Sequence, residues 1–585
     1  MFDALPPIVL ASAAVLAAAA WQWSGTAVML YTVPRSLGGA WRIALAACLW
    51  LPVSGAIAIA LSLAHLAGRT SFLIGTAAVL LASLPNARFL LQAARRGWRA
   101  LMGDVLPKER WLVRGALFAQ LVFIVFAAHP QRIYDQLNYH LVVGDLVVRD
   151  GQPFTGAWDP HPMFTGVVEW GLAWHRSWTD SKLLFHGMAQ IAVYFATVPA
   201  LVLAGLLLGK PSPLWFAVLC LALPGVVPEN SMLRMAKPDG VVLTATVLAL
   251  AMLPQSSPVA LGLCLLAMAC KLTAFHAALA LAAAALVSGR RRGEPAIALL
   301  GGAALALQLG KNAIVFANPV YPALAAAFPS WASDAWTENY WRGVAFQHGA
   351  SRWTGFLGPF LLLWPGRVLA GMLLAAGGAL LWKRQRPGDV RPVLVFLAVY
   401  AVTWPLFYGG GIEPRFVSAF SAGLLVLWWL FRASLPHRAV EIISLCLAIT
   451  VCGFGWAVMN IAKWNRGAAV DAFAMEWPRI RTARALQPLL DPRDTIVADA
   501  PEKFYFNARL LFEDPLSPRE RGILEGLRRD PWRTAQLHRV KAVIIGADHP
   551  MTPGMQKIWN ALQPRGRVLE LPPDRVLYSD CFFCQ

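Results

Sequence analysis

The sequence predicts an all-α polytopic membrane protein with a small soluble α/β domain at its C-terminal end. Of its 585 residues, 57% are hydrophobic and only 14% are charged, whereas roughly 25% are charged in an ordinary soluble domain. The mean hydropathy is +0.53. Apolar runs recur up to residue 460 and then stop. These observations argue against a soluble enzyme and make the lipid bilayer a partner of the chain.

The apolar runs set the number of membrane crossings. A helix needs about 20 mainly apolar residues to cross a bilayer. The candidate spans are 8–32, 43–66, 71–92, 112–129, 183–208, 213–228, 239–254, 295–312, 367–382, 392–408, 415–431 and 440–460. The stretch 258–288 is too long for one span and carries Lys271 in its middle. Because both of its flanks should be cytoplasmic, we expect two short helices that meet near Lys271. The total is then about fourteen transmembrane helices, within a range of roughly 12 to 16.

Basic residues in short loops predict the orientation, because such loops mark the cytoplasmic side. The strongest cluster runs from Arg95 to Arg114, and further clusters are Arg290–Arg292, 383–391, and Arg432 with Arg438. With these inside, the outer face holds both termini and three segments: 130–182, 313–352 and the tail 461–585. The net charge of +19 is therefore mainly an orientation signal, and no nucleic-acid partner is predicted.

The two ends of the chain differ in character. Met1–Pro7 contains no Lys or Arg, so the first helix is predicted to be a retained span rather than a signal peptide. In the tail, the β-branched runs Thr495–Val497 and Val540–Ile545 alternate with the charged, helix-like stretch 517–530, which favours α/β folding. For Cys581 and Cys584, a disulfide or an incidental pair is favoured over a metal site.

The first outer loop carries an acid just beyond a predicted helix end. The fourth predicted helix ends near His129, and the chain continues Tyr134-Asp135-Gln-Leu-Asn-Tyr139-His140. A carboxylate at this interface can be ionised and reach an acceptor hydroxyl, as a general base must. The alternative is that Asp135 is an ordinary loop acid. Loops as long as 130–182 usually have a function or are disordered, and this one is too aromatic for disorder.

These residues, with Asp150-Gly151 and the Pro-rich stretch that follows, resemble the first periplasmic loop of the GT-C superfamily of polytopic glycosyltransferases. The nearest members are bacterial relatives of protein O-mannosyltransferases and of the lipid A aminoarabinose transferase. Five further segments are similar to that group in the same order: Ala236-Lys-Pro-Asp239, Lys271-Leu-Thr273, Ala317-Asn-Pro-Val-Tyr-Pro322, Glu413-Pro-Arg-Phe416 and Ala498 to Arg509.

The resemblance implies transfer of a sugar, with inversion, from a polyprenyl-phosphate donor to a cell-envelope acceptor. This chemistry needs a base for the acceptor hydroxyl and positive charge for the departing lipid phosphate. Asp135 is the candidate catalytic base. Lys237, Lys271 and Arg415 are candidates for the phosphate, since each is expected at an outer helix end. Snorkelling to lipid headgroups is the alternative for these cations.

Other polar residues near these positions are candidates for binding substrate. Asp239 is expected to pair with Lys237 and orient it, or to cap its own helix. Tyr139 and His140 are candidates for hydrogen bonds to the sugar, and Glu169 is a second acid that can assist. Both histidine and tyrosine can instead be purely structural. No regular ligand spacing is present, so no metal or other cofactor is predicted, although a divalent cation stays possible.

The predicted organisation has three parts. Residues 1–111 form extra N-terminal helices, 112–460 form the GT-C-like catalytic core, and 461–585 form the periplasmic α/β domain. Richness in Ala, Gly and Arg suggests a GC-rich bacterium, which makes the inner membrane the expected location. Two other functions stay open. A secondary transporter or lipid flippase is disfavoured because no internal repeat is visible, and a polymerase or ligase of undecaprenyl-linked polysaccharide would differ in its acceptor.

Overall fold

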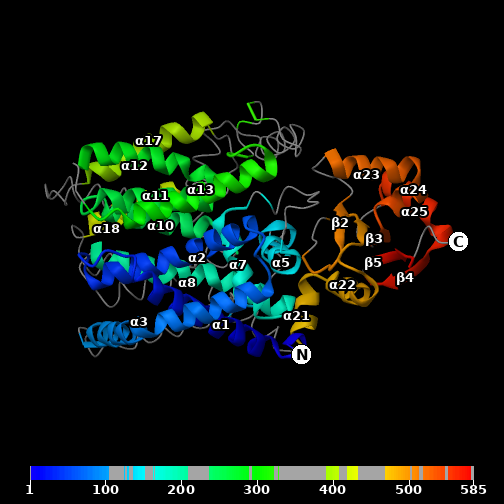
Figure 1. The fold of residues 1–585 in the computed structure, drawn as a ribbon, viewed down its shortest axis with the longest axis horizontal. Helices are drawn as coiled ribbons and strands as arrows, with labels where there is room; N and C mark the ends of the chain where they lie inside the picture. Colours follow the sequence, from blue (N-terminus) through cyan, green and yellow to red (C-terminus); the bar gives the residue numbers. More distant parts are fainter. Residues whose placement is uncertain are drawn as a thin grey trace.

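The fold is a helical bundle joined to a C-terminal α/β region (Figure 1). The computed structural model describes residues 2–103, 124–125, 128–130, 136–151, 163, 165–208, 236–288, 293–321, 324, 327–328, 390–407, 418–432, 468–500, 504–512, 518–546, 551–572 and 574–580. The predicted spans 112–129, 213–228, 367–382 and 440–460 lie wholly or largely outside these residues, as do Cys581 and Cys584.

The first layer of the bundle is built from the N-terminal helices and the first helix after the outer loop: α1 (Pro7–Met29), α2 (Gly39–Leu63), α3 (Arg69–Gly103) and α8 (Lys182–Leu208). A short 3₁₀ turn, η1 (Phe2–Ala4), precedes α1. Helix α2 packs against both α1 and α8. Proline stands at the first position of α1, where its missing N–H costs nothing. The predicted spans 8–32, 43–66, 71–92 and 183–208 are therefore helical, with α3 longer than expected.

The second layer holds the later helices: α10 (Asp239–Met252), α11 (Ser257–Cys270), α12 (Phe275–Ser288), α13 (Ala296–Phe316), α17 (Arg391–Phe407) and α18 (Ser418–Arg432). Helix α11 packs against α13, and α12 packs against α17. The hairpin expected within 258–288 is confirmed, because α11 ends at Cys270 and α12 follows the short 3₁₀ turn η3 (Leu272–Ala274).

Apolar length makes the chain a multi-pass membrane protein. Within the described ranges, five helices are long and apolar enough to span a membrane, namely Pro7–Met29, Gly39–Leu63, Arg69–Arg96, Lys182–Ala204 and Ala296–Phe316. Shorter apolar helices cover Asp239–Met252, Ser257–Cys270, Leu272–Ser288 and Arg391–Trp404. About fourteen crossings therefore remains an expectation from the sequence.

Between α3 and α8, the segment predicted as the first outer loop contains three helical elements. They are the π-helical turn η2 (Gln136–His140), α5 (Leu141–Asp150) and α7 (Val167–Ser177). Helix α7 packs against α2 and α5. Both α5 and α7 lie at the end of the bundle that faces the C-terminal α/β region (Figure 1).

The C-terminal region forms a five-stranded sheet in the order β2-β1-β3-β5-β4. Its strands are β1 (Thr495–Ala498), β2 (Arg509–Phe512), β3 (Val540–Gly546), β4 (Arg567–Leu571) and β5 (Asp574–Tyr578). Strand β1 is parallel to β2 and β3, while β5 is antiparallel to β3 and β4. The strands expected at 495–497 and 540–545 are confirmed, and the α/β prediction with them.

The helices of this region are α21 (Ala469–Glu476), α22 (Ile480–Leu486), α23 (Pro518–Arg529), α24 (Pro531–Leu537) and α25 (Pro553–Leu562), with 3₁₀ turns at Gln487–Leu489 and Gln563–Arg565. Helix α21 lies beside the N-terminus, where the Ala469 N–H donates a 2.8 Å hydrogen bond to the Leu5 carbonyl. The N-terminal end of α1 and the C-terminal region thus meet at the same end of the bundle (Figure 1).

Candidate functional site

Charged and polar side chains from five separate segments converge where α7 meets the α11–α12 hairpin. We call this group the polar cluster: His140, Glu169, Asp239, Lys271 and Lys311. All are buried except Lys271, which is partly exposed. Charges buried among apolar helices are expensive unless they are paired or serve a purpose, so their gathering at one place identifies the candidate site.

Glu169 and His140 form the first pair of the polar cluster. Glu169 lies in the first turn of α7, and its Oε1 is 2.9 Å from Nδ1 of His140, the last residue of η2. The Tyr139 ring lies beside the imidazole, with centroids 4.2 Å apart. Oε2 of Glu169 is buried and has no hydrogen-bond partner among the described residues. Since buried polar atoms are nearly always satisfied, this oxygen is available to a substrate group.

Lys271 and Asp239 form the second pair. The backbone leaves helical geometry at Lys271, where α11 ends, and its Nζ lies 2.5 Å from Oδ1 of Asp239. Asp239 is the first residue of α10. The sequence offered Lys237 as the partner of Asp239, whereas the structure supplies Lys271 as one, because the hairpin returns to the start of α10. Lys237 is itself 3% exposed and stands two residues before this pair.

Lys311 completes the cluster and was missed from the sequence. It lies in α13 with no exposed surface, and its Nζ donates to the carbonyl oxygens of Met163 and Thr165 at 2.7 Å each. The same Nζ is 5.3 Å from the centroid of the Trp170 ring. The available signal was a lysine inside the apolar run 295–312, since an ionisable residue at membrane depth is a functional candidate by default.

A glycine allows α7 to reach the hairpin. A Cβ atom on Gly166, the residue before α7, would lie 1.9 Å from the carbonyl oxygen of Cys270. Only glycine permits this approach. Because Cys270 precedes Lys271, the contact brings the first turn of α7, with Glu169, toward the Lys271–Asp239 pair.

Burial controls the protonation of Glu169, which lies outside the membrane-spanning helices. Removal of the carboxyl from water raises the pKa of Glu169 to about 8. The charges of Lys311 and Lys271 oppose this rise, and the charge of Asp239 adds to it, so all three residues influence the pKa of Glu169. The carboxyl is therefore mainly protonated at neutral pH and can donate as well as accept a hydrogen bond.

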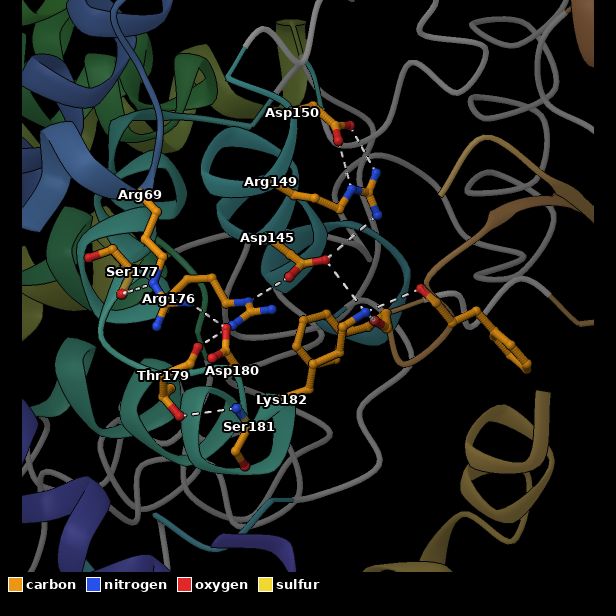
Figure 2. Close-up of polar contacts among 12 residues, drawn as sticks. Arg69, Asp145, Arg149, Asp150, Arg176, Ser177, Thr179, Asp180, Ser181 and Lys182 are labelled. Atoms are coloured by element: carbon orange, nitrogen blue, oxygen red, sulfur yellow. Dashed lines mark hydrogen bonds and ion pairs between the residues drawn. The ribbon is translucent and has the colours of Figure 1, made fainter. Parts of the chain in front are cut away.

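A second charged group, centred on Asp145 of α5, lies nearby between α3 and the start of α8 (Figure 2). Asp145 Oδ1 accepts from Arg176 Nε at 2.5 Å, and Oδ2 is 3.5 Å from Lys182 Nζ and 4.0 Å from Arg149. Burial raises the pKa of Asp145, but Lys182, Arg176 and Arg149 together outweigh it and lower the pKa to about 2. Asp145 is thus an ion-pair partner that stays charged at neutral pH, and a carboxylate with so low a pKa is a weak general base.

Among the other sequence motifs, the structure describes most of 317–322, whereas two candidate site residues lie outside the described ranges. Ala317 ends α13 with a left-handed backbone (φ 53°), and the Val320 N–H bonds Oδ1 of Asn318 at 3.0 Å, so this motif turns the chain. Asp135 and Arg415 lie outside the described residues, although Asp135 directly precedes η2. Within the described ranges, no group of three His, Cys, Asp or Glu side chains is placed to hold a metal ion.

Comparison with known proteins finds a distant structural likeness. No protein-family model matches the chain, and no curated protein does. The solved structure of ArnT from Cupriavidus metallidurans in the apo state aligns with 84% of this chain and 100% of its own, at 14% identity and a TM-score of 0.43. ArnT bound to undecaprenyl phosphate aligns with 82% of this chain and 99% of its own, at 14% identity and a TM-score of 0.40.

ArnT is the lipid A aminoarabinose transferase, a GT-C enzyme. A likeness at these values assigns no role to any residue.

Proposed function

We propose that the protein is an inverting membrane glycosyltransferase that moves a sugar from a polyprenyl-phosphate donor to a cell-envelope acceptor on the periplasmic face. The observation that carries this proposal is the polar cluster, where two lysines and two acids from separate helices meet at the end of an apolar bundle. A lipid-linked phosphate has its chain in the bilayer and its charge at the bilayer surface. A cationic site between apolar helices suits such a ligand.

The cations are proposed to bind the phosphate. Lys271 projects from the partly exposed hairpin tip, and its Asp239 partner holds the ammonium in place. Lys237 lies just before α10. Arg415 is proposed as a further phosphate-binding cation because of its position in the sequence. Positive charge at these points lowers the energy of the phosphate as the glycosidic bond breaks and negative charge develops on the leaving oxygen.

The Glu169–His140 pair is proposed to bind the sugar. Oε2 of Glu169, which has no hydrogen-bond partner among the described residues, offers a hydrogen bond to a hydroxyl group, and the adjoining Tyr139 ring offers an apolar face. Asp135, at the entrance to η2, is proposed to take the proton of the acceptor hydroxyl while that oxygen attacks the anomeric carbon from the side opposite the phosphate. Attack from that side gives inversion.

Transfer in reconstituted vesicles tests this proposal. Purified protein is incubated with undecaprenyl-phosphate sugars carrying a radiolabel in the sugar, together with an envelope extract, and product is measured by thin-layer chromatography. Asp135→Asn keeps the size of the side chain and removes the base. We expect its kcat to fall by at least about 100-fold, the lower range for general-base catalysis, with little change in the donor KM.

Two outcomes would contradict the proposal. Full activity of Asp135→Asn would exclude Asp135 as the general base. Movement of a lipid or solute across the vesicle membrane without a glycosylated product would favour a flippase or transporter. Mass spectrometry of envelope glycans from a deletion strain separates single-sugar transfer from polymerisation, because the second changes chain length.

A further inference from the structure

A short segment of the C-terminal region, Phe504–Phe506, contacts η2 beside the candidate site. The Phe504 N–H donates to the carbonyl oxygen of Leu137 at 2.9 Å. Leu137 belongs to η2, which begins directly after Asp135 and ends at His140 in the polar cluster. The contact therefore joins the C-terminal region to the turn that lies between the candidate base and a sugar-binding candidate.

Lys182 contacts both the Phe504–Phe506 segment and α5, the helix that continues η2. Its Nζ donates to the carbonyl oxygens of Phe504 at 2.6 Å and Phe506 at 3.2 Å, and it lies 3.5 Å from Oδ2 of Asp145 (Figure 2). An ammonium group has three donors, and three acceptors surround this one. The Phe504 ring adds a cation–π contact, with its centroid 5.3 Å from Nζ.

These contacts fix η2 and α5 at two points. Leu137 lies near the start of this continuous helical stretch and is bonded by Phe504 directly. Asp145 lies in its second half and contacts Lys182, which also bonds Phe504 and Phe506. Asp145 and Lys182 are both largely withdrawn from water, with side-chain exposures of 6% and 12%. Partly buried charge pairs of this kind enforce one geometry more than exposed pairs do.

We propose that Lys182 and the Phe504–Phe506 segment position η2 for transfer, so that the C-terminal region sets the geometry of the reaction. The proposal rests on the proposed function. Lys182 is a positioning residue, since it acts through Phe504, whose N–H bonds Leu137, and through Asp145, and it contacts none of the proposed phosphate-binding lysines in the described structure. Loss of its amine should therefore lower kcat and leave donor binding largely intact.

The test compares Lys182→Met with Lys182→Arg and a matched control in the full-length protein. Methionine keeps a long apolar stem, whereas arginine keeps the charge and the donors. The control is Arg484→Met, which breaks another ionic contact between the C-terminal region and the N-terminal end, to Asp3 in η1. The measurements are kcat, donor KM and hydrogen exchange at the Phe504 amide, which reports directly on the bond to Leu137.

For Lys182→Met we expect at least a tenfold fall in kcat, a donor KM within about twofold of wild type, and at least tenfold faster exchange at Phe504. Lys182→Arg should recover much of the lost kcat, and Arg484→Met should match wild type in all three. If Lys182→Met does not accumulate, Phe504→Leu replaces it under the same expectations, because it removes the ring beside Nζ and keeps an apolar side chain.

A kcat within twofold of wild type in the tested variant would overturn the inference, whether or not exchange accelerates. So would an equal fall in Arg484→Met, because any loosened contact would then have the same effect. Wild type and Asp135→Asn are measured in the same assay. Absence of product from wild type, or full activity of Asp135→Asn, counts against the proposed function rather than against the role of Lys182.

Discussion

At the scale of single residues, the decisive feature is charge placed where water is scarce. Glu169, Asp239 and Lys311 are each at most 2% exposed, and each has an oppositely charged or hydrogen-bonding neighbour. In the Lys271–Asp239 ion pair, removing Lys271 leaves the buried charge of Asp239 uncompensated and costs about 3–5 kcal/mol. Buried charge of this kind is retained in a protein because it orients groups or binds a ligand, and both uses suit a site for a charged lipid.

The pH dependence of stability tests the environment of Glu169. Its folded pKa is raised to about 8, well above the roughly 4.3 of an unfolded glutamate. Between these values the folded protein holds a proton that the unfolded chain has released, so the free energy of unfolding falls as pH rises. We expect Glu169→Gln to show a smaller fall in melting temperature than wild type between pH 5 and 8 in detergent.

Circular dichroism at several pH values supplies the melting temperatures. Glutamine keeps the shape of the side chain and cannot ionise, so the difference between the two proteins isolates the carboxyl. Parallel curves for wild type and Glu169→Gln would show that this carboxyl ionises normally in the folded protein.

At the scale of elements, the site depends on how closely α7 approaches the α11–α12 hairpin. Helix α7 is short and amphipathic, and it gains its place by packing against α2 and α5. The hairpin adds Lys271 where α11 ends in extended backbone. Displacing either element by about one ångström would change the placement of Glu169 relative to the cations, and displacements of this size can cost about 100-fold in rate.

Gly166→Ala tests this approach. Its Cβ would lie 1.9 Å from the Cys270 carbonyl, so backbone must move. We expect a lower melting temperature and at least a tenfold loss of transfer. Gly310→Ala in α13 is the matched control, since a Cβ there meets no atom of the described residues within 4 Å, and alanine should stabilise that helix slightly. Equal melting temperatures and equal transfer rates in the two variants would contradict the close packing of Gly166 against the Cys270 carbonyl.

At the scale of the whole molecule, the C-terminal region has an ionic core of its own beside its contacts with the bundle. Arg479 bonds Asp499, which follows β1, at 2.8 Å and lies 3.0 Å from Asp574 at the start of β5. The second oxygen of Asp499 accepts from the Gly546 N–H at the end of β3 at 2.7 Å. The point where the strand order reverses, a common ligand site in such sheets, is thus occupied by this chain's own side chains.

Removal of this arginine should loosen the C-terminal region. Asp574 is 1% exposed in its side chain, so Arg479→Met leaves a buried acid without its cation. We expect destabilisation of about 3–5 kcal/mol, measured by pulse proteolysis of the full-length protein in urea. Arg529→Met, which breaks an exposed pair with Glu525, should change stability by less than about 1 kcal/mol. Similar losses of stability in Arg479→Met and Arg529→Met would contradict the role of Arg479 as the cation that compensates the buried Asp574.

Patterns local in the sequence predicted the helices, the hairpin at 258–288 and the strands at 495–497 and 540–545. Apolar run length and β-branched composition report on burial of nearby residues, and these elements need no distant partner to be recognised. Asp135 and Arg415 stay predictions from the sequence, as do the total number of crossings and the periplasmic face.

The pairings inside the site could not be predicted in this way. Asp239 pairs with Lys271 across 32 positions of the chain, and His140 pairs with Glu169 across 29. Lys311 entered the site only because α13 packs beside α11 and places its ammonium against the carbonyls of Met163 and Thr165. In a single sequence, such a lysine differs little from one that snorkels to a headgroup.

The sequence by itself determined that this chain is a basic, multi-pass membrane protein with an α/β region at its end, because hydropathy and charge act locally and add along the chain. Only the tertiary structure decided which charges meet, that Asp145 serves an ion-pair group, and that Lys182 ties the C-terminal region to η2. The physical reason is that Coulomb energy and hydrogen bonding depend on distance in space, and folding sets those distances between residues far apart in sequence.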